Sequence, residues 1–347
     1  MRFDDVFLES FAHCLPQRIV TSLTIEEQLA PLYARLGLSS GRIELMSGIR
    51  ERRFWDPGTR PSSVAARAGD LALDASGIDR ARIGCLIHAS VCRDFLEPAT
   101  ASVVHRTLEL APRCLVFDLS NACLGFANAL VVVAHMIERR EIDAALVVSG
   151  EDGGPLVEST IAALLALPHD ARKNRDALKR AYASLTIGAG AAACVLAHRS
   201  IAKSTRRLLG GVALAATEHV ELCHGDHVAG AAGPLMETDS EALLHAGNAL
   251  AQRTWAEFER AIGWTTRDVE RVVTHQVGVA HRRLTLGTIG LDPALDFPTV
   301  ETLGNIGSVS LPLSFSRAIE AGFIRPGHKT ALLGIGSGLH CAMLAVE

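Results

Sequence analysis

Continuous runs of apolar residues recur along the chain at the length expected of β-strands. Each run holds six or seven residues, and within most of them apolar and polar positions do not alternate. This is the pattern of strands that are covered on both faces. Eight such runs predict strands at residues 85–91, 114–119, 144–149, 191–197, 211–216, 271–276, 330–335 and 341–346.

Longer stretches between these runs have the character of helices. They predict helices at residues 61–76, 100–110, 124–141, 241–263, 275–287 and 308–321. Because the two kinds of element alternate, the sequence predicts an α/β fold with sheet buried between helices.

Two parts of the chain share one order of elements. Residues 134–151 and 316–338 each read as a helix, a short charged link, an apolar strand and a Gly-rich turn, and a second apolar strand follows in both. A duplicated domain would account for this pattern and for the chain length, although coincidence stays open on sequence alone. We predict an N-terminal half at residues 1–205 and a C-terminal half at residues 206–347.

Two segments interrupt the repeat and are predicted to be excursions from the core. The first, residues 152–184, contains HDARKNRDALKR, which is typical of a solvated helix face. The second, residues 218–240, contains GDHVAGAAGP, a Gly- and Ala-rich run that we expect to be mobile.

Composition excludes several classes of protein. Of the 347 residues, 48% are hydrophobic and 21% charged, which is enough apolar material for a large core. The net charge is −4 and no basic block occurs, so neither nucleic acid nor an anionic membrane is an expected partner. Asp4 and Asp5 stand where a signal peptide would be apolar, and residues 126–137 are too short to span a bilayer. We expect a cytoplasmic protein without an integral membrane segment.

The eight cysteines form no CxxC pair, and several lie in the apolar runs. Most are therefore predicted to be buried free thiols, and neither a disulfide framework nor a metal site is indicated.

One cysteine differs from the others in its position. Cys123 follows Ser120 and Asn121, which are good helix caps, and we expect it in the first turn of a helix. Unpaired N–H groups and the helix dipole favour a thiolate there, so the position predicts an activated cysteine. The alternative is a small, buried and inert side chain.

Three further features have both a functional and an ordinary interpretation. His275 ends a predicted strand, where open α/β sheets place functional groups, but a histidine satisfied by hydrogen bonds is common there. Asn305 lies in a glycine turn before a helix, which is also where an ordinary turn Asn occurs. GIGSGLH, residues 334–340, could present N–H groups to an oxyanion or simply be a hairpin.

Taken in order, these features resemble the thiolase superfamily, in particular its ketosynthase III branch. NACLGF, HQV, GNIG and LGIGSGL match the family's motifs over nearly the whole chain. The resemblance implies a duplicated five-layer α-β-α-β-α fold. It also implies a catalytic triad of Cys123, His275 and Asn305, with an oxyanion or substrate loop at Gly336, Ser337 and Gly338.

A narrower resemblance involves SVCRDFLEPATASVV, which is similar to the OleA family of enzymes that join two fatty acyl-CoAs head to head. ERRFWD, ERREIDAALVVSGE and THQV also resemble that family. The resemblance implies that Glu97 is a catalytic base supplied by the partner subunit of a homodimer. The alternative is an exposed loop acid.

Two departures from the OleA pattern concern substrate choice more than reaction type. Cys123 and His275 are 152 positions apart, which we expect to be longer than in the family because of the segment GDHVAGAAGP. In addition, Gly125 stands where the family resembled has Ala.

The resemblance therefore implies an acyltransferase that condenses two fatty acyl-CoAs through an acyl-Cys intermediate without decarboxylation. The 2-alkyl-3-oxoacyl product would be released as a β-keto acid, and no metal or redox cofactor is implied beyond CoA as the substrate's carrier. Because no carboxylate is expelled, a base must remove the α-proton, and Glu97 suits this role. The alternatives are a malonyl-ACP-dependent 3-oxoacyl-ACP synthase III or related secondary-metabolite acyltransferase, and a non-catalytic thiolase-fold scaffold.

Overall fold

A computed structural model describes residues 1–168, 170–227 and 233–347 of the chain. Its first main sheet has five strands in the order β1-β7-β6-β4-β5. β4 runs parallel to β5 and β6, whereas β7 is antiparallel to β1 and β6. The strands are β1 (Val6–Cys14), β4 (Ile83–His88), β5 (Leu115–Asp118), β6 (Ala144–Asp152) and β7 (Ala189–His198).

The second main sheet has four strands in the order β11-β12-β13-β8. β11 is parallel to β12, and the other two pairs are antiparallel. The strands are β8 (Leu208–Ala215), β11 (Arg271–Thr274), β12 (Thr330–Gly336) and β13 (His340–Val346). All eight predicted strands are present in the two sheets.

The strand order repeats between the sheets. β1-β7-β6-β4 in the first corresponds to β8-β13-β12-β11 in the second, with the same sequence of antiparallel, antiparallel and parallel pairs. The duplication predicted from the sequence is therefore confirmed, and β5 is an addition to the first sheet. The predicted division after residue 205 falls between the end of β7 and the start of β8.

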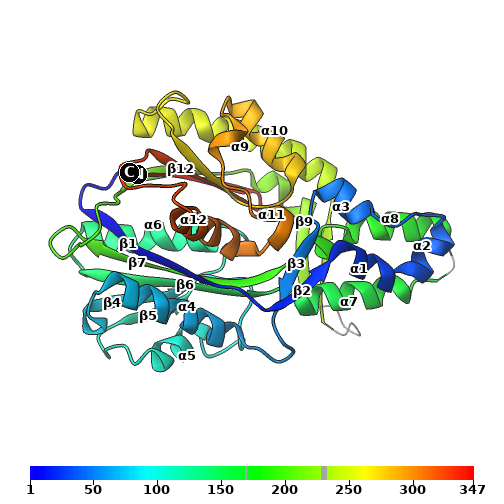
Figure 1. The fold of residues 1–347 in the computed structure, drawn as a ribbon, viewed down its shortest axis with the longest axis horizontal. Coiled ribbons are helices and arrows are strands. Elements are labelled where there is room, and N and C mark those ends of the chain that lie inside the picture. Colours follow the sequence, from blue (N-terminus) through cyan, green and yellow to red (C-terminus); the bar gives the residue numbers. More distant parts are fainter. Residues whose placement is uncertain (169, 228–232) are drawn as a thin grey trace.

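Helices cover both faces of each sheet and give the molecule five layers (Figure 1). α6 (Gly125–Glu138) and α12 (Ser310–Glu320) lie between the two sheets, and their apolar side chains form one core with both. α4 (Pro61–Ser76) and α5 (Thr100–Thr107) cover the outer face of the first sheet. α9 (Ser240–Ile262) and α10 (Val279–Ile289) cover the outer face of the second. The layered architecture agrees with the predicted fold class.

The remaining elements form a lobe at one end of the layers, seen at the right of Figure 1. The two predicted excursions meet in it, because Ser184 Oγ of the first donates to the carbonyl of Met236 in the second at 3.0 Å. The elements are β2 (Arg18–Thr21), α1 (Ser22–Gln28), α2 (Ala30–Leu36), α3 (Arg42–Ser47), β3 (Glu51–Phe54), α7 (Gly154–Leu165), α8 (Ala171–Ala181), β9 (Cys223–His227), β10 (Pro234–Thr238) and α11 (Val300–Leu303).

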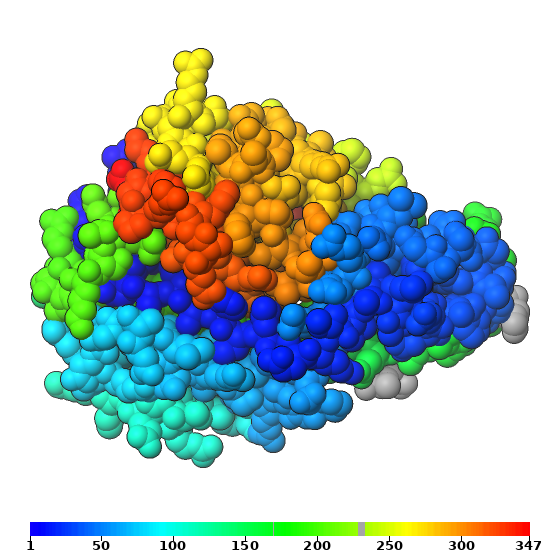
Figure 2. All heavy atoms as spheres, in the orientation of Figure 1, coloured from blue at the N-terminus to red at the C-terminus, as the bar shows by residue number. Residues whose placement is uncertain are grey.

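The N-terminal residues run between the two halves. Figure 2 shows them in blue across one face, between cyan residues of the first half and orange residues of the second. β1 lies at the edge of the first sheet beside β7, and Phe3 N–H donates to the carbonyl of Leu209 in β8 of the second sheet at 2.9 Å. The start of the chain therefore ties both halves together.

Several local predictions can be compared with the structure. The charged run after residue 169 forms α8, most of whose side chains are exposed, as predicted. The predicted helix at 275–287 begins only at Val279, because residues 275–278 form a link after β11. Of the run GDHVAGAAGP, residues 225–227 belong to β9, whereas residues 228–232 lie outside the described residues. Within the described ranges, no helix is both long enough and apolar enough to cross a membrane.

Candidate active site

Cys123 lies in a tight turn between β5 and α6. Ala122, directly before it, has a φ of 45°, which is a strained value for a residue with a Cβ. The turn is closed by the N–H of Leu124, which donates to the carbonyl of Asn121 at 2.9 Å. Since α6 begins at Gly125, the prediction that Cys123 lies within the first helical turn is wrong by two residues. The sulphur instead sits at a strained elbow just before the helix.

The charge state expected for Cys123 is also wrong. Burial raises the pKa of its thiol to about 12, and the nearby Cys223 and Glu151 raise it further. Desolvation therefore outweighs the effect of the helix terminus, on which the prediction of an activated cysteine was based. The resting group is therefore a neutral thiol, which can act as a nucleophile only where a base takes its proton.

His275 follows β11 directly and extends its pairing with β12. Its backbone N–H donates to the carbonyl of Leu333 at 2.8 Å, and the residue is 6% exposed. Burial, together with the nearby His281, lowers the pKa of the imidazole to about 4. His275 is therefore neutral at pH 7. Its Nδ1 has no hydrogen-bond partner among the described residues. A neutral, unpartnered imidazole is able to accept a proton.

The neighbours of His275 fix it to the segment that leads to Asn305. The carboxylate of Asp296 accepts from the N–H and the hydroxyl of Thr274, both at 3.0 Å. On the other side of the histidine, Gln276 Oε1 accepts from the N–H of Thr299 at 3.1 Å. Both flanks of His275 are thus held by residues 296–299.

Asn305 sits in a turn made possible by two glycines with positive φ, Gly304 at 69° and Gly307 at 53°. Its side-chain Oδ1 accepts from the N–H of Gly307 at 3.0 Å. Since this bond uses the carbonyl oxygen, any donor role toward a substrate falls to the amide nitrogen. Ser308 Oγ donates to the carbonyl of Ala122 at 2.8 Å. The asparagine turn is therefore bonded to the cysteine turn.

The glycine loop closes the site from the second sheet. Gly336 ends β12 and pairs with His340 at the start of β13, so the loop is a hairpin, one of the two interpretations that the sequence left open. A Cβ on Gly336 would lie 3.4 Å from the backbone nitrogen of Cys123. The hairpin thus also lies directly against the cysteine turn.

Glu97 belongs to the segment between β4 and α5, and its side chain is exposed. Leu96 beside it is 96% exposed, whereas the base of the segment is anchored. There Asp94 accepts from the N–H of Ser62 at 2.9 Å and from its hydroxyl at 2.6 Å. We call residues 91–98 the glutamate arm. In a single chain it presents Glu97 to the surroundings rather than enclosing it beside Cys123.

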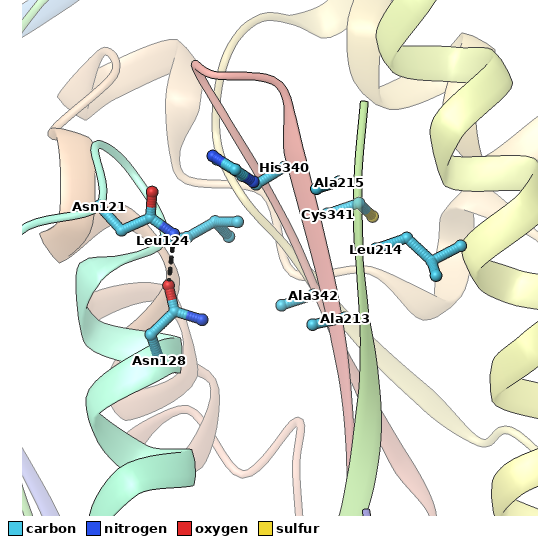
Figure 3. A pocket seen from close by; sticks show the side chains of 9 residues that line it. All are labelled: Asn121, Leu124, Asn128, Ala213, Leu214, Ala215, His340, Cys341 and Ala342. Carbon is cyan, nitrogen blue, oxygen red and sulfur yellow. Dashed lines mark hydrogen bonds between the residues drawn. The ribbon is translucent and has the colours of Figure 1, made fainter. Parts of the chain in front are cut away.

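A small cavity of about 150 Å³ adjoins the cysteine turn (Figure 3). It opens between the start of α6 and the strands β8 and β13, where alanine side chains leave room. Asn121 and Asn128 lie on one side and are joined by a hydrogen bond of 2.7 Å. The lining residues are Asn121, Leu124, Asn128, Ala213, Leu214, Ala215, His340, Cys341 and Ala342. The site therefore borders on a space with largely apolar walls.

Comparison with known proteins identifies the family. The 3-oxoacyl-[acyl-carrier-protein (ACP)] synthase III family matches residues 117–213, and its C-terminal family matches residues 259–347. The chain is 37% identical to the acyl-CoA:acyl-CoA alkyltransferase of Shewanella oneidensis, over 100% of both chains. It is 38% identical to the enzyme of that name from Xanthomonas campestris, over 100% of this chain and 99% of the relative. The chain belongs to the OleA family of acyl-CoA:acyl-CoA alkyltransferases.

Solved OleA structures have the same fold. The crystal structure of cerulenin-bound Xanthomonas campestris OleA superposes with a TM-score of 0.94 at 38% identity, covering 100% of this chain and 98% of that one. A Xanthomonas OleA with bound lauric acid and lauroyl-CoA gives a TM-score of 0.92 at 37% identity, covering 99% of each chain. The thiolase-like fold expected from the motifs is confirmed.

Other OleA structures carry substitutions of one cysteine, one glutamate or one histidine. These are the residue types singled out here at Cys123, Glu97 and His275. The substituted glutamate precedes the cysteine by 26 positions, the same separation as between Glu97 and Cys123. From cysteine to histidine the separation is 142 positions there and 152 here.

The sequence analysis missed three residues near the site. Cys223 and Glu151 influence the pKa of Cys123, and His281 influences that of His275. Glu151 had a visible signal, because it is an acid at the end of a continuous apolar run. Cys223 and His281 had none. Cys223 begins β9 in the second excursion, and His281 lies in the first turn of α10, where no local sequence pattern marks it as a site residue.

Proposed function

We propose that this chain condenses two fatty acyl-CoAs without decarboxylation, through an acyl-Cys123 intermediate, to a 2-alkyl-3-oxoacyl product released as a β-keto acid. Full-length similarity to acyl-CoA:acyl-CoA alkyltransferases supports the reaction. The observation that carries the assignment of residues is the bond between Ser308 and the carbonyl of Ala122. It joins the asparagine turn to the cysteine turn beside the end of β12.

In the first step, Cys123 attacks the thioester carbonyl of one acyl-CoA. Because both groups are neutral at rest, His275 takes the thiol proton as the S–C bond forms. The oxyanion is held by backbone N–H groups of Cys123 and of the loop formed by Gly336, Ser337 and Gly338. When the carbonyl re-forms, the C–S bond to CoA breaks and the departing CoA sulphur takes the proton back from His275.

In the second step, the other acyl-CoA loses a proton from the carbon next to its thioester. Glu97 of the partner subunit accepts this proton, and His275 and Asn305 donate hydrogen bonds to the enolate oxygen. The carbanion attacks the acyl-Cys123 carbonyl and a C–C bond forms, while the C–S bond to Cys123 breaks and the sulphur takes up the proton that Glu97 had accepted. Water then hydrolyses the CoA thioester of the condensed product, which releases CoA and the β-keto acid. No external electron carrier enters either step, so we expect no cofactor beyond CoA.

Replacing Glu97 by Gln tests this assignment directly. Glutamine keeps the shape of the side chain but cannot accept the proton, so condensation is expected to fall by about a hundredfold or more. Acylation of Cys123 should persist, since it does not involve Glu97. Mass spectrometry of the intact protein after incubation with an acyl-CoA should show the acyl-enzyme, while the ketone formed by decarboxylation of the product disappears.

A malonyl-ACP-dependent 3-oxoacyl-ACP synthase III is the second candidate, because the two matching family descriptions carry that name. Such an enzyme obtains its carbanion by loss of carbon dioxide and needs no separate base. It predicts that Glu97→Gln retains condensation activity and that malonyl-ACP is the better donor. A cytoplasmic location stays a prediction under both candidates.

A further inference from the structure

A buried carboxylate that the mechanism above does not use lies at the end of β6. Glu151 is 4% exposed, and both of its oxygens accept backbone N–H groups. Oε1 accepts from Val91 at 2.9 Å and Oε2 accepts from Cys92 at 3.0 Å. These two residues begin the glutamate arm, so Glu151 holds the base of the segment that carries Glu97.

The other side of the same carboxylate faces the asparagine turn. A Cβ at Gly307 would lie 3.2 Å from Glu151 Oε1, and Gly307 adopts a φ of 53°. The turn can therefore press its backbone against the carboxylate. Burial raises the pKa of Glu151, while the backbone N–H groups of Val91, Cys92 and Ser308 lower it in part. Glu151 thus contacts two segments that the chain supplies from opposite halves of the molecule.

We propose that Glu151 is a positioning residue that fixes the glutamate arm and the asparagine turn relative to each other, and through Ser308 relative to Cys123. The inference rests on the function proposed above for Glu97 and Asn305. Glu151 touches no reacting atom in this scheme. Glu151 determines the positions of the proposed base, Glu97, and of the proposed enolate donor, Asn305.

The physical reason lies in the geometry of the two accepted hydrogen bonds. A carboxylate offers acceptors on both oxygens, so two neighbouring N–H groups can be satisfied at once. Glutamine offers only one acceptor oxygen, and its NH₂ group would face an N–H donor. One buried N–H would lose its partner or the arm would shift to find another. A displacement of about 1 Å at a reacting group can reduce a rate about a hundredfold.

The charge of Glu151 provides a second, independent readout. It is one of the two groups that raise the pKa of Cys123 beyond the effect of burial, Cys223 being the other. Cys92 also faces the carboxylate, and its thiol has a raised pKa as well. Removing the charge should therefore lower the pKa of Cys123, an effect that a merely space-filling side chain would not produce.

Two substitutions separate the effect of the Glu151 charge from the effect of its side-chain length. Glu151→Gln keeps the length and removes the charge, whereas Glu151→Asp keeps the charge and shortens the side chain. Glu158→Gln is the matched control, because Glu158 lies on α7 with a side chain 64% exposed. For each dimeric variant we would measure acylation and condensation with one acyl-CoA, and the pH profile of Cys123 alkylation by iodoacetamide, resolved by peptide mass spectrometry.

For Glu151→Gln we expect kcat for condensation to fall about tenfold to a hundredfold, with KM within about twofold and the alkylation profile shifted to lower pH. For Glu151→Asp we expect a similar fall in kcat with an unshifted profile. The control should behave like the unmodified enzyme. If Glu151→Gln does not fold, Glu151→Asp still tests whether the length of the side chain is needed to position the glutamate arm.

Normal condensation in either folded Glu151 variant, together with an inactive Glu97→Gln, would overturn this inference and leave the proposed function intact. An alkylation pH profile that is unchanged in Glu151→Gln would overturn the proposed effect of the Glu151 charge on the pKa of Cys123. If Glu97→Gln itself condenses normally, the proposed base fails and the role of Glu151 in holding the arm fails with it.

Discussion

Desolvation decides the charge state of the reacting residues. The pKa of Cys123 is raised to about 12 and that of His275 is lowered to about 4, in both cases chiefly by burial. The thiol and the imidazole are therefore both neutral at rest, and in the proposed mechanism the ion pair forms only during the reaction. Such a site differs from one whose cysteine is already a thiolate at rest, because its reactivity depends on transfer of the thiol proton to a base.

Acylation of Cys123 should consequently show little pH dependence near neutrality. We expect a constant rate of CoA release between about pH 6 and 8, and a fall below that range as His275 gains a proton near its pKa of about 4. His275→Gln should slow the release by about a hundredfold or more. Stopped-flow detection of free CoA in the first turnover measures both. A tenfold rise per pH unit between 6 and 8 would instead indicate a free thiolate.

His88 offers a prediction about stability. It is 1% exposed at the end of β4, and burial lowers its pKa to about 4, against which Asp118 and Asp94 act. The unfolded chain binds a proton here near pH 6.5 and the folded chain does not, so the contribution is fully favourable above pH 6.5 and is lost as pH falls toward 4. Between pH 7 and 5 the loss is about 2 kcal/mol.

Replacing His88 by Gln removes this titration. The free energy of unfolding in urea would be measured at pH 7 and at pH 5. Its decrease from pH 7 to pH 5 should be about 2 kcal/mol smaller for the variant than for the unmodified protein. His245→Gln, at an exposed position on α9, is the control. Equal pH dependence in all three proteins would contradict the prediction.

At the scale of elements, the sequence predicted those helices and strands that have a local hydrophobic pattern. The eight central strands are visible because both of their faces are covered and their apolar runs are continuous. β1 was missed, because in the structure its buried and part-exposed positions alternate and it follows an acidic start. Cys123, His275 and Asn305 were predicted as site residues from short motifs. Glu151 was missed as a site residue, because its partners Val91 and Cys92 lie about 60 positions away.

The loop before α11 carries a prediction of its own. Asp296 has a fully buried side chain, and one of its oxygens accepts from Arg282 Nε on α10 at 2.5 Å. The same carboxylate holds Thr274 beside His275. Asp296→Asn removes the charge opposite Arg282, so we expect a loss of about 3 kcal/mol in the free energy of unfolding and reduced acylation of Cys123.

Urea unfolding and the burst of CoA release measure the two effects of Asp296→Asn. Asp176→Asn, on the exposed side of α8, is the matched control and should change neither by more than about 0.5 kcal/mol or twofold. A stable Asp296→Asn protein with an unchanged burst would show that this network does not hold His275 in place.

At the scale of the whole molecule, the tip of the glutamate arm is a part that the chain itself does not cover. Its base is anchored to Glu151 and Ser62, yet Leu96 and Glu97 at its tip are exposed. Anchored ends with an exposed apolar tip are typical of a segment that a second protein surface covers. The proposed homodimer would place this tip in the partner's site.

Mixed dimers test that arrangement. A chain with Glu97→Gln and a chain with Cys123→Ala are each expected to be inactive in condensation. When the two are unfolded and refolded together in equal amounts, half of the dimers pair one of each, and each mixed dimer holds one complete site. We expect about a quarter of the unmodified activity to return. No recovery, with mixed dimers confirmed by mass spectrometry, would show that Glu97 serves its own chain.

The repeated strand order has a consequence for how such a site arises. Cys123 stands two residues before α6 begins, and Ser308 stands two residues before α12 begins, at the matching point of the other half. The two turns hold matching places in the repeated order of elements, as expected if two copies of one unit had been fused into one polypeptide. In a true symmetric ancestor, both turns would have carried the same side chain. In a duplicated chain the two turns are free to differ, so one can carry the proposed nucleophile and the other a serine that bonds to its turn.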